Sequence, residues 1–352
     1  MKTIIQKVTS TNLQKVDFQL AEQFLKEGEL VAFPTETVYG LGGNALDPNA
    51  AKKIYAAKGR PSDNPLIVHI AQTDALKVLA DDIPKEALEL AHAFWPGPLT
   101  MILKKSAVVP YETTGGLDTV AIRMPSHPVA RKLIQESGVY LAAPSANLSG
   151  RPSPTTANHV IEDMDGRIAM IIDGGSAQIG LESTIIDLTG ENPMILRPGY
   201  ITLEMLLNVV DEVKYDPAVI TRQLKEDIVA KAPGMKYRHY APKGQLIIFE
   251  GPMQKVVDTI NEKTAKRIQE GYQVGVLATD ETKKAYKQGH VKSIGSRKDE
   301  EAIAAHLFGI LRDFDTLGVS YIYSESFEDN ALSQAIMNRL LKAAGYQMIR
   351  CD

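Results

Sequence analysis

Hydrophobic and polar positions follow two different patterns along this chain, and the patterns predict where strands and helices lie. Short apolar runs such as residues 30–33 and 64–70 are bounded by glycine, proline or polar residues, which is typical of buried strands. Between such runs, apolar residues recur at helical spacing, as they do over residues 12–27. We expect further strands at 99–103, 119–123, 139–143, 169–173 and 183–188, and further helices at 48–57, 73–79, 85–94, 128–136 and 201–210.

Residues 34–70 are the stretch around which the first half of the chain is organised. We expect residues 35–44 to form a polar, glycine-rich loop after the strand at 30–33. Asp47 is a predicted N-cap, and Gly59 is a predicted end of the helix that follows. Lys58 and Arg60 therefore gather with hydroxyl and amide side chains at the ends of buried elements, where a rigid scaffold often presents small ligands.

The chain changes character after residue 210. Residues 211–242 are charged and broken by prolines, and their last ten residues are rich in aromatic and cationic side chains, which predicts a functional connection. From residue 243, strand-like and helix-like patterns alternate, which favours a small α/β domain with a largely parallel sheet. We therefore predict a first domain at 1–210, a linker at 211–242 and a second domain at 243–352.

Composition excludes several classes of protein. The 352 residues carry a net charge of −4, which argues against a dedicated nucleic-acid binder but not against a local basic site. The single cysteine, Cys351, cannot form a disulfide framework or a cysteine zinc site within one chain. No run approaches the ~18 apolar residues of a membrane helix, and the apolar start is too short for a signal peptide. We expect a cytoplasmic protein with no membrane contact.

Familiar nucleotide and metal motifs do not account for this sequence. No GxxxxGK[ST] P-loop is present, and the histidines show no spacing typical of metal ligands, so we expect no metal held by the protein. Residues 40–45 do match GxGxxA. However, they lie too far from the preceding strand, and the helix starts after them, so a dinucleotide-binding interpretation is weak.

Each candidate residue also has an ordinary structural interpretation. Lys58 and Arg60 suit a phosphate, but a helix C-terminus also favours cations. Ser145 and Asn147 follow a buried strand, where such residues often stabilise turns. His69 lies in an apolar strand, where a core histidine is the common case. The residues alone indicate an anionic small molecule, plausibly a nucleotide, and no reaction.

Several motifs together resemble one family. Lys58-x-Arg60 with Ser145-x-Asn147 is similar to the KxR…SxN signature of YrdC-like domains. Further matches lie at residues 34–40, 183–184 and 196–199. Residues 234–242 and the α/β tail resemble the longer, two-domain threonylcarbamoyl-AMP synthases of this family.

The resemblance implies a fold and a reaction. The fold would be a twisted YrdC-like α/β domain with a deep positive cavity, followed by a smaller Rossmann-like α/β domain. L-threonine, bicarbonate and ATP would give threonylcarbamoyl-AMP and pyrophosphate, which makes the enzyme a nucleotidyltransferase. A partner transferase would then use the product to modify tRNA. Mg²⁺ would be carried on the ATP phosphates with few protein ligands.

The resemblance also implies roles for individual residues. The catalytic residues would be Lys58, Arg60, Ser145 and Asn147. ATP would be bound by Arg60, Asn64, Thr119, Ser145, Ser153, Arg197 and a linker tyrosine, either Tyr237 or Tyr240. Threonine would be bound by Thr37, His69, Arg123, Ala143 and Ser183. Arg123 would hold the threonine carboxylate in a bidentate fork.

The linker would fold over the cavity as a lid that excludes water from a labile carbamate and adenylate. Two other functions stay open. A related carbamoyl-adenylating enzyme would carry cysteine-rich zinc modules, and this chain has one cysteine. An RNA-binding YrdC-like module would use a basic patch made of Lys52, Lys53, Lys58, Arg60, Lys104 and Lys105.

Overall fold

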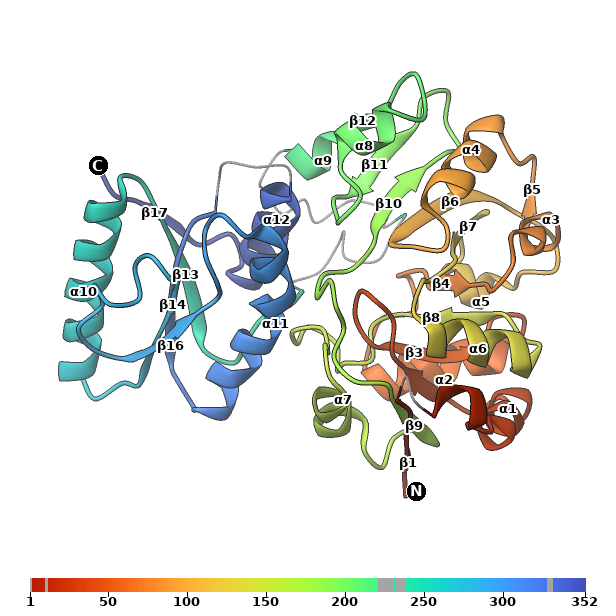
Figure 1. Cartoon of the computed structure of the whole chain (residues 1–352), viewed down its shortest axis with the longest axis horizontal. Coiled ribbons are helices and arrows are strands. Elements are labelled where there is room, and N and C mark those ends of the chain that lie inside the picture. Colours follow the sequence, from red (N-terminus) through yellow and green to blue (C-terminus); the bar gives the residue numbers. More distant parts are fainter. Residues whose placement is uncertain (1, 10–11, 221–230, 232–238, 328–331) are drawn as a thin grey trace. The chain divides into compact units, whose positions relative to one another are not determined.

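The computed structural model describes residues 2–9, 12–220, 231, 239–327 and 332–352, and it divides into two compact units (Figure 1). The first unit consists mainly of Met1–Ser149 and Ser153–Thr221, and the second mainly of Gly150–Pro152 and Tyr237–Asp352. The domain boundaries expected at residues 210 and 242 stay predictions. Within the described parts of the chain, no helix is both long and apolar enough to span a membrane.

The first unit is built on one mixed sheet of 12 strands in the order β1-β9-β2-β3-β8-β4-β7-β6-β10-β11-β12, with β5 paired to β6. The strands are β1 (Ile4–Lys7), β2 (Val31–Phe33), β3 (Gly40–Asn44), β4 (Ile67–His69), β5 (Ala80–Asp81), β6 (Leu99–Lys105), β7 (Thr119–Arg123), β8 (Leu141–Ala143), β9 (Met170–Asp173), β10 (Thr184–Asp187), β11 (Met194–Arg197) and β12 (Lys214–Tyr215). The expected α/β class is confirmed.

The helices of the first unit are α1 (Gln19–Lys26), α2 (Pro48–Lys58), α3 (Leu76–Leu79), α4 (Lys85–Phe94), α5 (Tyr111–Thr114), α6 (Pro128–Ser137), α7 (Ala157–Met164), α8 (Leu203–Leu207) and α9 (Pro217–Ile220), with short 3₁₀ turns at Leu13–Lys15 and Thr73–Ala75. Helix α2 has the predicted ends. The Asp47 side chain accepts a hydrogen bond from the Asn49 N–H, and Gly59 adopts a left-handed φ of 61°. Glycine reaches this conformation without steric cost, so it ends the helix.

Two local predictions are wrong. Residues 12–27 do not form one helix, because a 3₁₀ turn and an extended stretch precede α1. Residues 35–44 are not all loop, because Gly40–Asn44 is strand β3, paired with β2 and β8. A Cβ on Gly42 would lie 2.9 Å from the Phe33 ring, so the glycines make room for that ring. This packing explains the GxGxxA match without a dinucleotide.

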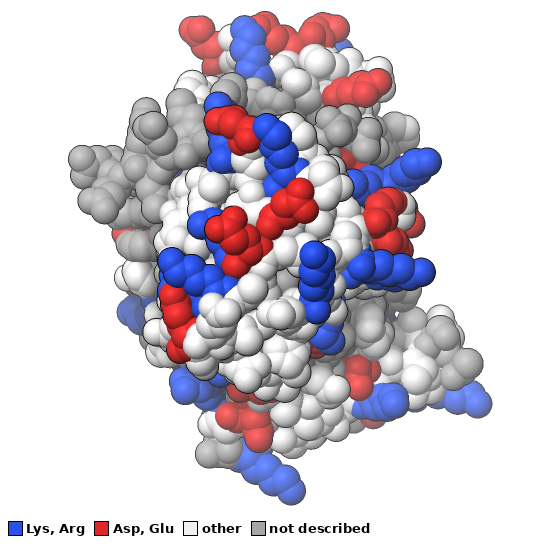
Figure 2. All heavy atoms as spheres, turned by 90° about the vertical axis from the view of Figure 1, so that its left-hand side faces the viewer, with Lys and Arg blue, Asp and Glu red and all other residues white. Residues whose placement is uncertain are grey.

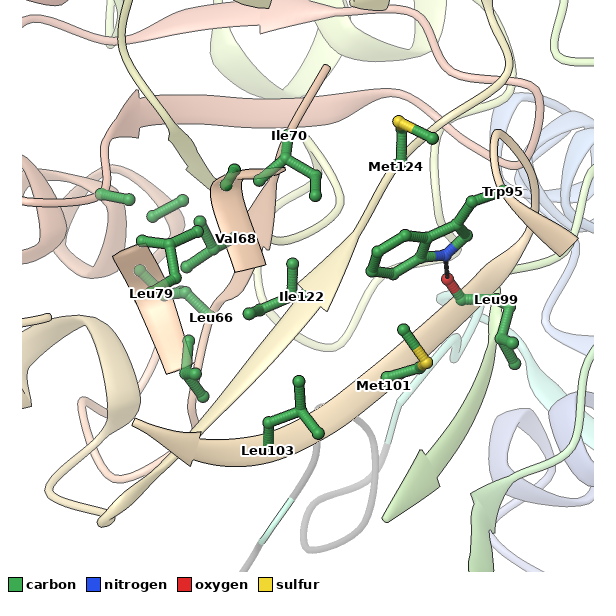
Figure 3. Close-up of a cluster of buried hydrophobic side chains, with 14 of the residues drawn as sticks. Leu66, Val68, Ile70, Leu79, Trp95, Leu99, Met101, Leu103, Ile122 and Met124 are labelled. Atoms are coloured by element: carbon green, nitrogen blue, oxygen red, sulfur yellow. Dashed lines mark hydrogen bonds between the residues drawn. The ribbon is translucent and has the colours of Figure 1, made fainter. Parts of the chain in front are cut away.

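The main core of the first unit fills one face of the central strands (Figure 3). Val68 of β4 and Ile122 of β7 belong to it, together with Trp95, whose ring N–H donates to the Leu99 carbonyl at 2.7 Å. Side chains alternate between the two faces of a strand. His69 of β4 and Arg123 of β7 therefore lie on the opposite face from this core.

The second unit is a five-stranded sheet in the order β15-β14-β16-β13-β17, and every pairing is parallel. Its elements are β13 (Gln245–Glu250), α10 (Met253–Gln269), β14 (Val274–Ala278), β15 (His290–Ser293), α11 (Glu300–Thr316), β16 (Tyr321–Glu325), α12 (Ser333–Ala343) and β17 (Met348–Arg350). Helix α10 covers one face of the sheet, and α11 and α12 cover the other (Figure 1). The predicted parallel α/β domain is thus confirmed.

Candidate active site

The candidate residues lie at the two ends of a pair of central strands, β4 and β7. These strands are parallel, with Ile67 opposite Ala121 and His69 opposite Arg123. Asn64 lies just before β4, and Thr119 begins β7, so both belong to the amino ends of the strands. The predicted threonine ligands His69 and Arg123 thus lie at one end, and the predicted ATP ligands Asn64 and Thr119 lie at the other.

Arg123 is held by three groups at the carboxyl ends of these strands. Its Nη2 donates to Glu36 Oε1 at 2.6 Å, its Nη1 donates to Thr37 Oγ1 at 2.8 Å, and its Nε donates to the Gly97 carbonyl at 3.4 Å. A guanidinium has five N–H groups, so two are left over for a ligand. The structure therefore brings the predicted threonine ligands Arg123 and Thr37 together and adds Glu36.

The charges at this end are set by burial and by the Arg123–Glu36 pair. Burial alone would raise the pKa of Glu36, but the adjacent Arg123 guanidinium brings that pKa below its usual value. Burial, with help from the Arg123 charge, lowers the pKa of His69 to about 3. At neutral pH we therefore expect an ionised Glu36 beside a neutral His69, whose Nδ1–H donates to the Ile67 carbonyl at 3.0 Å.

Ser183 and Arg197 adjoin the same end through β6. Arg197 donates from Nε to the Ser183 carbonyl at 3.0 Å and from Nη2 to Ser183 Oγ at 3.1 Å. Ser183 Oγ also lies 2.7 Å from Thr100 Oγ1, and Thr100 is opposite Arg123 in the β6–β7 ladder. Arg197 is a predicted ATP ligand and Ser183 a predicted threonine ligand, so their contact joins the two sets.

Lys58 links the two halves of the KxR…SxN signature. Its side chain is buried, at 3% exposed, and its ammonium donates to the backbone carbonyls of Ser145 and Asn147. Ser145 in turn donates to Asn147 Oδ1 at 2.5 Å. Lys58, Ser145 and Asn147 of the signature therefore meet in space, with Lys58 anchoring the loop that follows β8.

Asn64 has an unusual environment for a buried side chain. It is 0% exposed, and neither its amide nitrogen nor its amide oxygen has a hydrogen-bond partner among the described residues. Buried amides are normally paired, since an unpaired one costs roughly 1–3 kcal/mol. Arg60 donates from Nη2 to the Asn64 and Pro65 carbonyls at 3.2 Å each, so a guanidinium lies close to this amide. The arrangement suits a polar ligand such as a phosphate.

Ala143 and Ser153 have a clear place in the first unit. Ala143 ends β8 opposite Ile67, between the two ends of the site. Ser153 is fully buried and donates to Glu182 Oε1. The roles expected for both residues stay predictions.

The two linker tyrosines cannot be assigned in the same way. Tyr240 is buried in the second unit, where its ring lies 5.2 Å from the Phe308 ring and 6.0 Å from the Arg339 guanidinium. Tyr237 lies outside the described residues, as does most of the segment expected to act as a lid. The lid and its tyrosine stay predictions.

Two glutamates of the site could not be recognised from the sequence. Glu36 lies inside the 34–40 motif, and Glu182 directly precedes Ser183, but a lone glutamate in a loop has the appearance of an ordinary surface residue. Their partners Arg123 and Ser153 are 87 and 29 residues away. No signal within either segment could have revealed those pairs.

Three of the six residues of the basic patch expected for RNA are paired with carboxylates. Lys53 lies 2.6 Å from Glu29, Lys104 lies 3.3 Å from Asp82, and Lys52 lies 3.5 Å from Glu112. Figure 2 shows a face of the second unit, which does not contain this patch, and basic and acidic side chains are interspersed there as well. A metal site made of three or more histidine, cysteine or carboxylate groups is not found in the part of the chain that the structure describes.

A mixed sheet that gathers the KxR…SxN residues defines the YrdC-like class of protein, and comparison with known proteins agrees. The family described as "Telomere recombination" matches residues 23–199, and the "Threonylcarbamoyl-AMP synthase, C-terminal domain" matches residues 201–345. The chain belongs to the two-domain threonylcarbamoyl-AMP synthase family.

Individual relatives match along nearly the whole chain. Threonylcarbamoyl-AMP synthase from Pyrococcus abyssi is 53% identical and covers 96% of this chain and 97% of its own. The Bacillus subtilis protein of the same name is 51% identical over 94% of this chain and 93% of its own. The crystal structure of P. abyssi Sua5 complexed with L-threonine has a TM-score of 0.92 at 52% identity, covering 99% of this chain and 100% of that chain. The fold expected from the sequence is therefore that of a known two-domain protein.

Proposed function

We propose that this protein is an L-threonylcarbamoyladenylate synthase and therefore a nucleotidyltransferase. L-threonine, bicarbonate and ATP give threonylcarbamoyl-AMP, pyrophosphate and water. The observation that carries the proposal is the placement of candidate ligands at opposite ends of β4 and β7. Arg123 and His69 lie at one end, and the Asn64 amide, which has no hydrogen-bond partner among the described residues, lies at the other. Family membership supports the same reaction.

The Arg123 end would bind the amino acid. Two N–H groups of Arg123 remain for the substrate carboxylate, and Thr37 and His69 lie beside them. Because His69 is neutral, its Nε2 can accept a hydrogen bond, which suits a substrate hydroxyl or amine. Holding the amine in a fixed place favours formation of a bond between its nitrogen and the bicarbonate carbon, which gives a carbamate and releases water.

The Asn64 end would bind ATP. The carbamate oxygen attacks the α-phosphorus, a new P–O bond forms, and the bond to pyrophosphate breaks. Such a transfer depends on positioning and on neutralising charge, which Arg60 can supply beside Asn64 and Lys58 can supply beside Ser145 and Asn147. Mg²⁺ would enter on the phosphate oxygens and offset their charge, since this ion needs few protein ligands. No covalent nucleophile is required.

The product is a mixed anhydride, which water would hydrolyse. A lid formed by the linker would protect it, and a partner transferase would then pass the threonylcarbamoyl group to tRNA. Because Lys52, Lys53 and Lys104 of the expected RNA patch are paired with carboxylates, and Lys58 is buried, we propose that the transferase supplies the main contact with tRNA.

The test is direct synthesis by the purified protein. The protein is mixed with ATP, Mg²⁺, L-threonine and bicarbonate, and the adenylate and pyrophosphate are measured by mass spectrometry. Product that requires both threonine and bicarbonate is expected. If no adenylate forms and RNA binding competes with ATP in a strongly salt-dependent way, the protein is instead an RNA-binding member of the family.

A further inference from the structure

The ion pair between Arg123 and Glu36 determines which charge the amino-acid end of the site presents. The two side chains are 4% and 5% exposed, and their closest nitrogen and oxygen atoms are 2.6 Å apart. Because the formal charges of the pair cancel, a ligand at this end meets an arginine that is already paired with a carboxylate, while the buried Arg197 adjoins the same end through Ser183. In a pocket that binds a simple carboxylate ligand, we would expect the guanidinium to have no acidic partner from the protein.

Both members of the pair keep unused hydrogen-bonding capacity. Three of the five N–H groups of Arg123 are engaged, and Glu36 Oε2 makes no close hydrogen bond to the residues that the structure describes, although the backbone N–H groups of Glu36 and Ser126 lie near the carboxylate and help to lower its pKa. An unpaired buried carboxylate oxygen is unfavourable, and a donor supplied by a ligand would relieve it. The pair thus offers donors for a carboxylate and an acceptor for an ammonium group.

We propose that Glu36 is a specificity-determining residue that makes this end of the site select a zwitterion, namely an α-amino acid that binds with its carboxylate and its ammonium group and loses one ammonium proton before the nitrogen captures bicarbonate carbon. The inference rests on the proposed function. Beside the Arg123–Glu36 pair, a ligand with a carboxylate alone would bring a negative charge close to Glu36 with no cation of its own, and one with an ammonium alone would bring a positive charge close to Arg123. Either arrangement is costly, because a buried charge needs a partner.

Three compounds of nearly the same shape separate these cases. L-threonine is a zwitterion, 3-hydroxybutyrate lacks the amine, and 1-amino-2-propanol lacks the carboxylate. Binding of each to the full-length protein is measured by isothermal titration calorimetry. We expect the unmodified protein to bind L-threonine at least about tenfold more tightly than either analogue. Equal affinity for L-threonine and 3-hydroxybutyrate would overturn the proposal without any variant.

Glu36→Gln tests the role of the charge. The amide keeps the shape of the side chain and one acceptor for Arg123, but the negative charge is lost. We expect L-threonine binding to weaken at least about tenfold, while 3-hydroxybutyrate binding weakens less or improves. The ratio of the two dissociation constants then shifts by at least about tenfold towards the anion. A residue that only supports Arg123 would weaken both ligands by one factor, and an unchanged ratio would refute the inference.

Glu36→Asp is the matched control, because it keeps the charge on a shorter side chain. It is expected to keep the preference for L-threonine over 3-hydroxybutyrate, and loss of that preference would contradict the proposal. The outcomes are separate from those of the synthesis assay. Unmodified protein that makes the adenylate, together with a Glu36→Gln variant whose ligand ratio is unchanged, would disprove only the role of Glu36.

Discussion

Arg123→Lys is the substitution that tests the amino-acid end most sharply. Lysine keeps the positive charge that Glu36 needs, so the loss of about 3–5 kcal/mol expected on removing one partner of a buried pair is avoided. An ammonium group cannot reproduce the planar fork, however, and the hydrogen bond from Nη1 to Thr37 is lost. We expect the free energy of unfolding to fall by about 1 kcal/mol, the usual contribution of one hydrogen bond.

The effect on threonine should be larger than the effect on folding. Losing a charge-assisted hydrogen bond to the substrate carboxylate costs roughly 1.5–3 kcal/mol, so the KM for L-threonine should rise by roughly 10- to 100-fold. Thr119 and Arg123 are four residues apart on β7, or about 13 Å. Among the described residues, Arg123 makes no hydrogen bond with Thr119, Asn64 or Arg60, so the KM for ATP should rise by much less than the KM for L-threonine.

The assay is pyrophosphate release, with L-threonine varied at saturating ATP and bicarbonate and then ATP varied at saturating L-threonine. Urea unfolding of the same samples gives the change in stability. Arg131→Lys is the control, because Arg131 is an exposed residue of α6. An unchanged KM for L-threonine would refute the role of Arg123. A parallel rise in both KM values would refute the division of the site between the ends of β4 and β7.

Three further predictions follow from burial and packing. Asn64→Leu removes a buried amide that has no hydrogen-bond partner among the described residues, so the free energy of unfolding in urea without nucleotide should rise by about 1 kcal/mol. The KM for ATP should rise at least about tenfold, and a lower free energy of unfolding would contradict this account. Gly199→Ala places a Cβ 2.4 Å from the Thr184 nitrogen and should reduce the rate of pyrophosphate release. Gly309→Ala is the control, because there is open space around Gly309 and the rate should not change. Equal rates for the two variants would show that the backbone around Gly199 adjusts to the added methyl group. The pKa of His69 is about 3 in the folded state and about 6.5 when unfolded. Below pH 6.5 the unfolded chain binds a proton that the folded protein does not, so the free energy of unfolding falls by about 1.4 kcal/mol per pH unit until pH 3. In urea unfolding between pH 4 and pH 7, the free energy of unfolding of His69→Gln should change less with pH than that of the unmodified protein. Equal slopes would show that His69 does not cause the pH dependence.

Local signals in the sequence predicted the elements that local interactions stabilise. Helix α2 is the clear case, because its cap and its final glycine act within a few residues of the helix ends. The alternating pattern of the second unit likewise predicted a parallel sheet, since strands separated by helices lead to parallel pairing. The KxR…SxN motifs, in their order along the chain, indicated the family as well.

Strand β3 shows where this kind of reasoning fails. Its glycines have low strand propensity, and nothing within residues 40–44 favours an extended segment. Pairing with β2 on one side and β8 on the other stabilises the strand, and the Phe33 ring fills the space that absent side chains leave. A long-range pairing and a close packing contact therefore outweighed the local preference for a loop.

The site divides in the same way. Lys58, Arg60, Ser145, Asn147 and Arg123 could be named as candidates from the sequence, because their types and spacing matched known phosphate and carboxylate chemistry and a family signature. The sequence by itself thus determined the ends of helix α2, the class of fold and the membership of the family. These features depend on residues that are neighbours in the sequence or on short motifs that can be read directly from it.

Only the tertiary structure decided the electrostatics of the site. Glu36 and Arg123 are 87 residues apart, and they become a neutral buried pair because β7 ends beside the loop after β2. The neutral state of His69 and the lack of a partner for the Asn64 amide among the described residues also depend on what surrounds them in the fold. A pKa or an unpaired hydrogen bond depends on desolvation and on neighbouring charges, and the fold brings these together from distant segments of the chain.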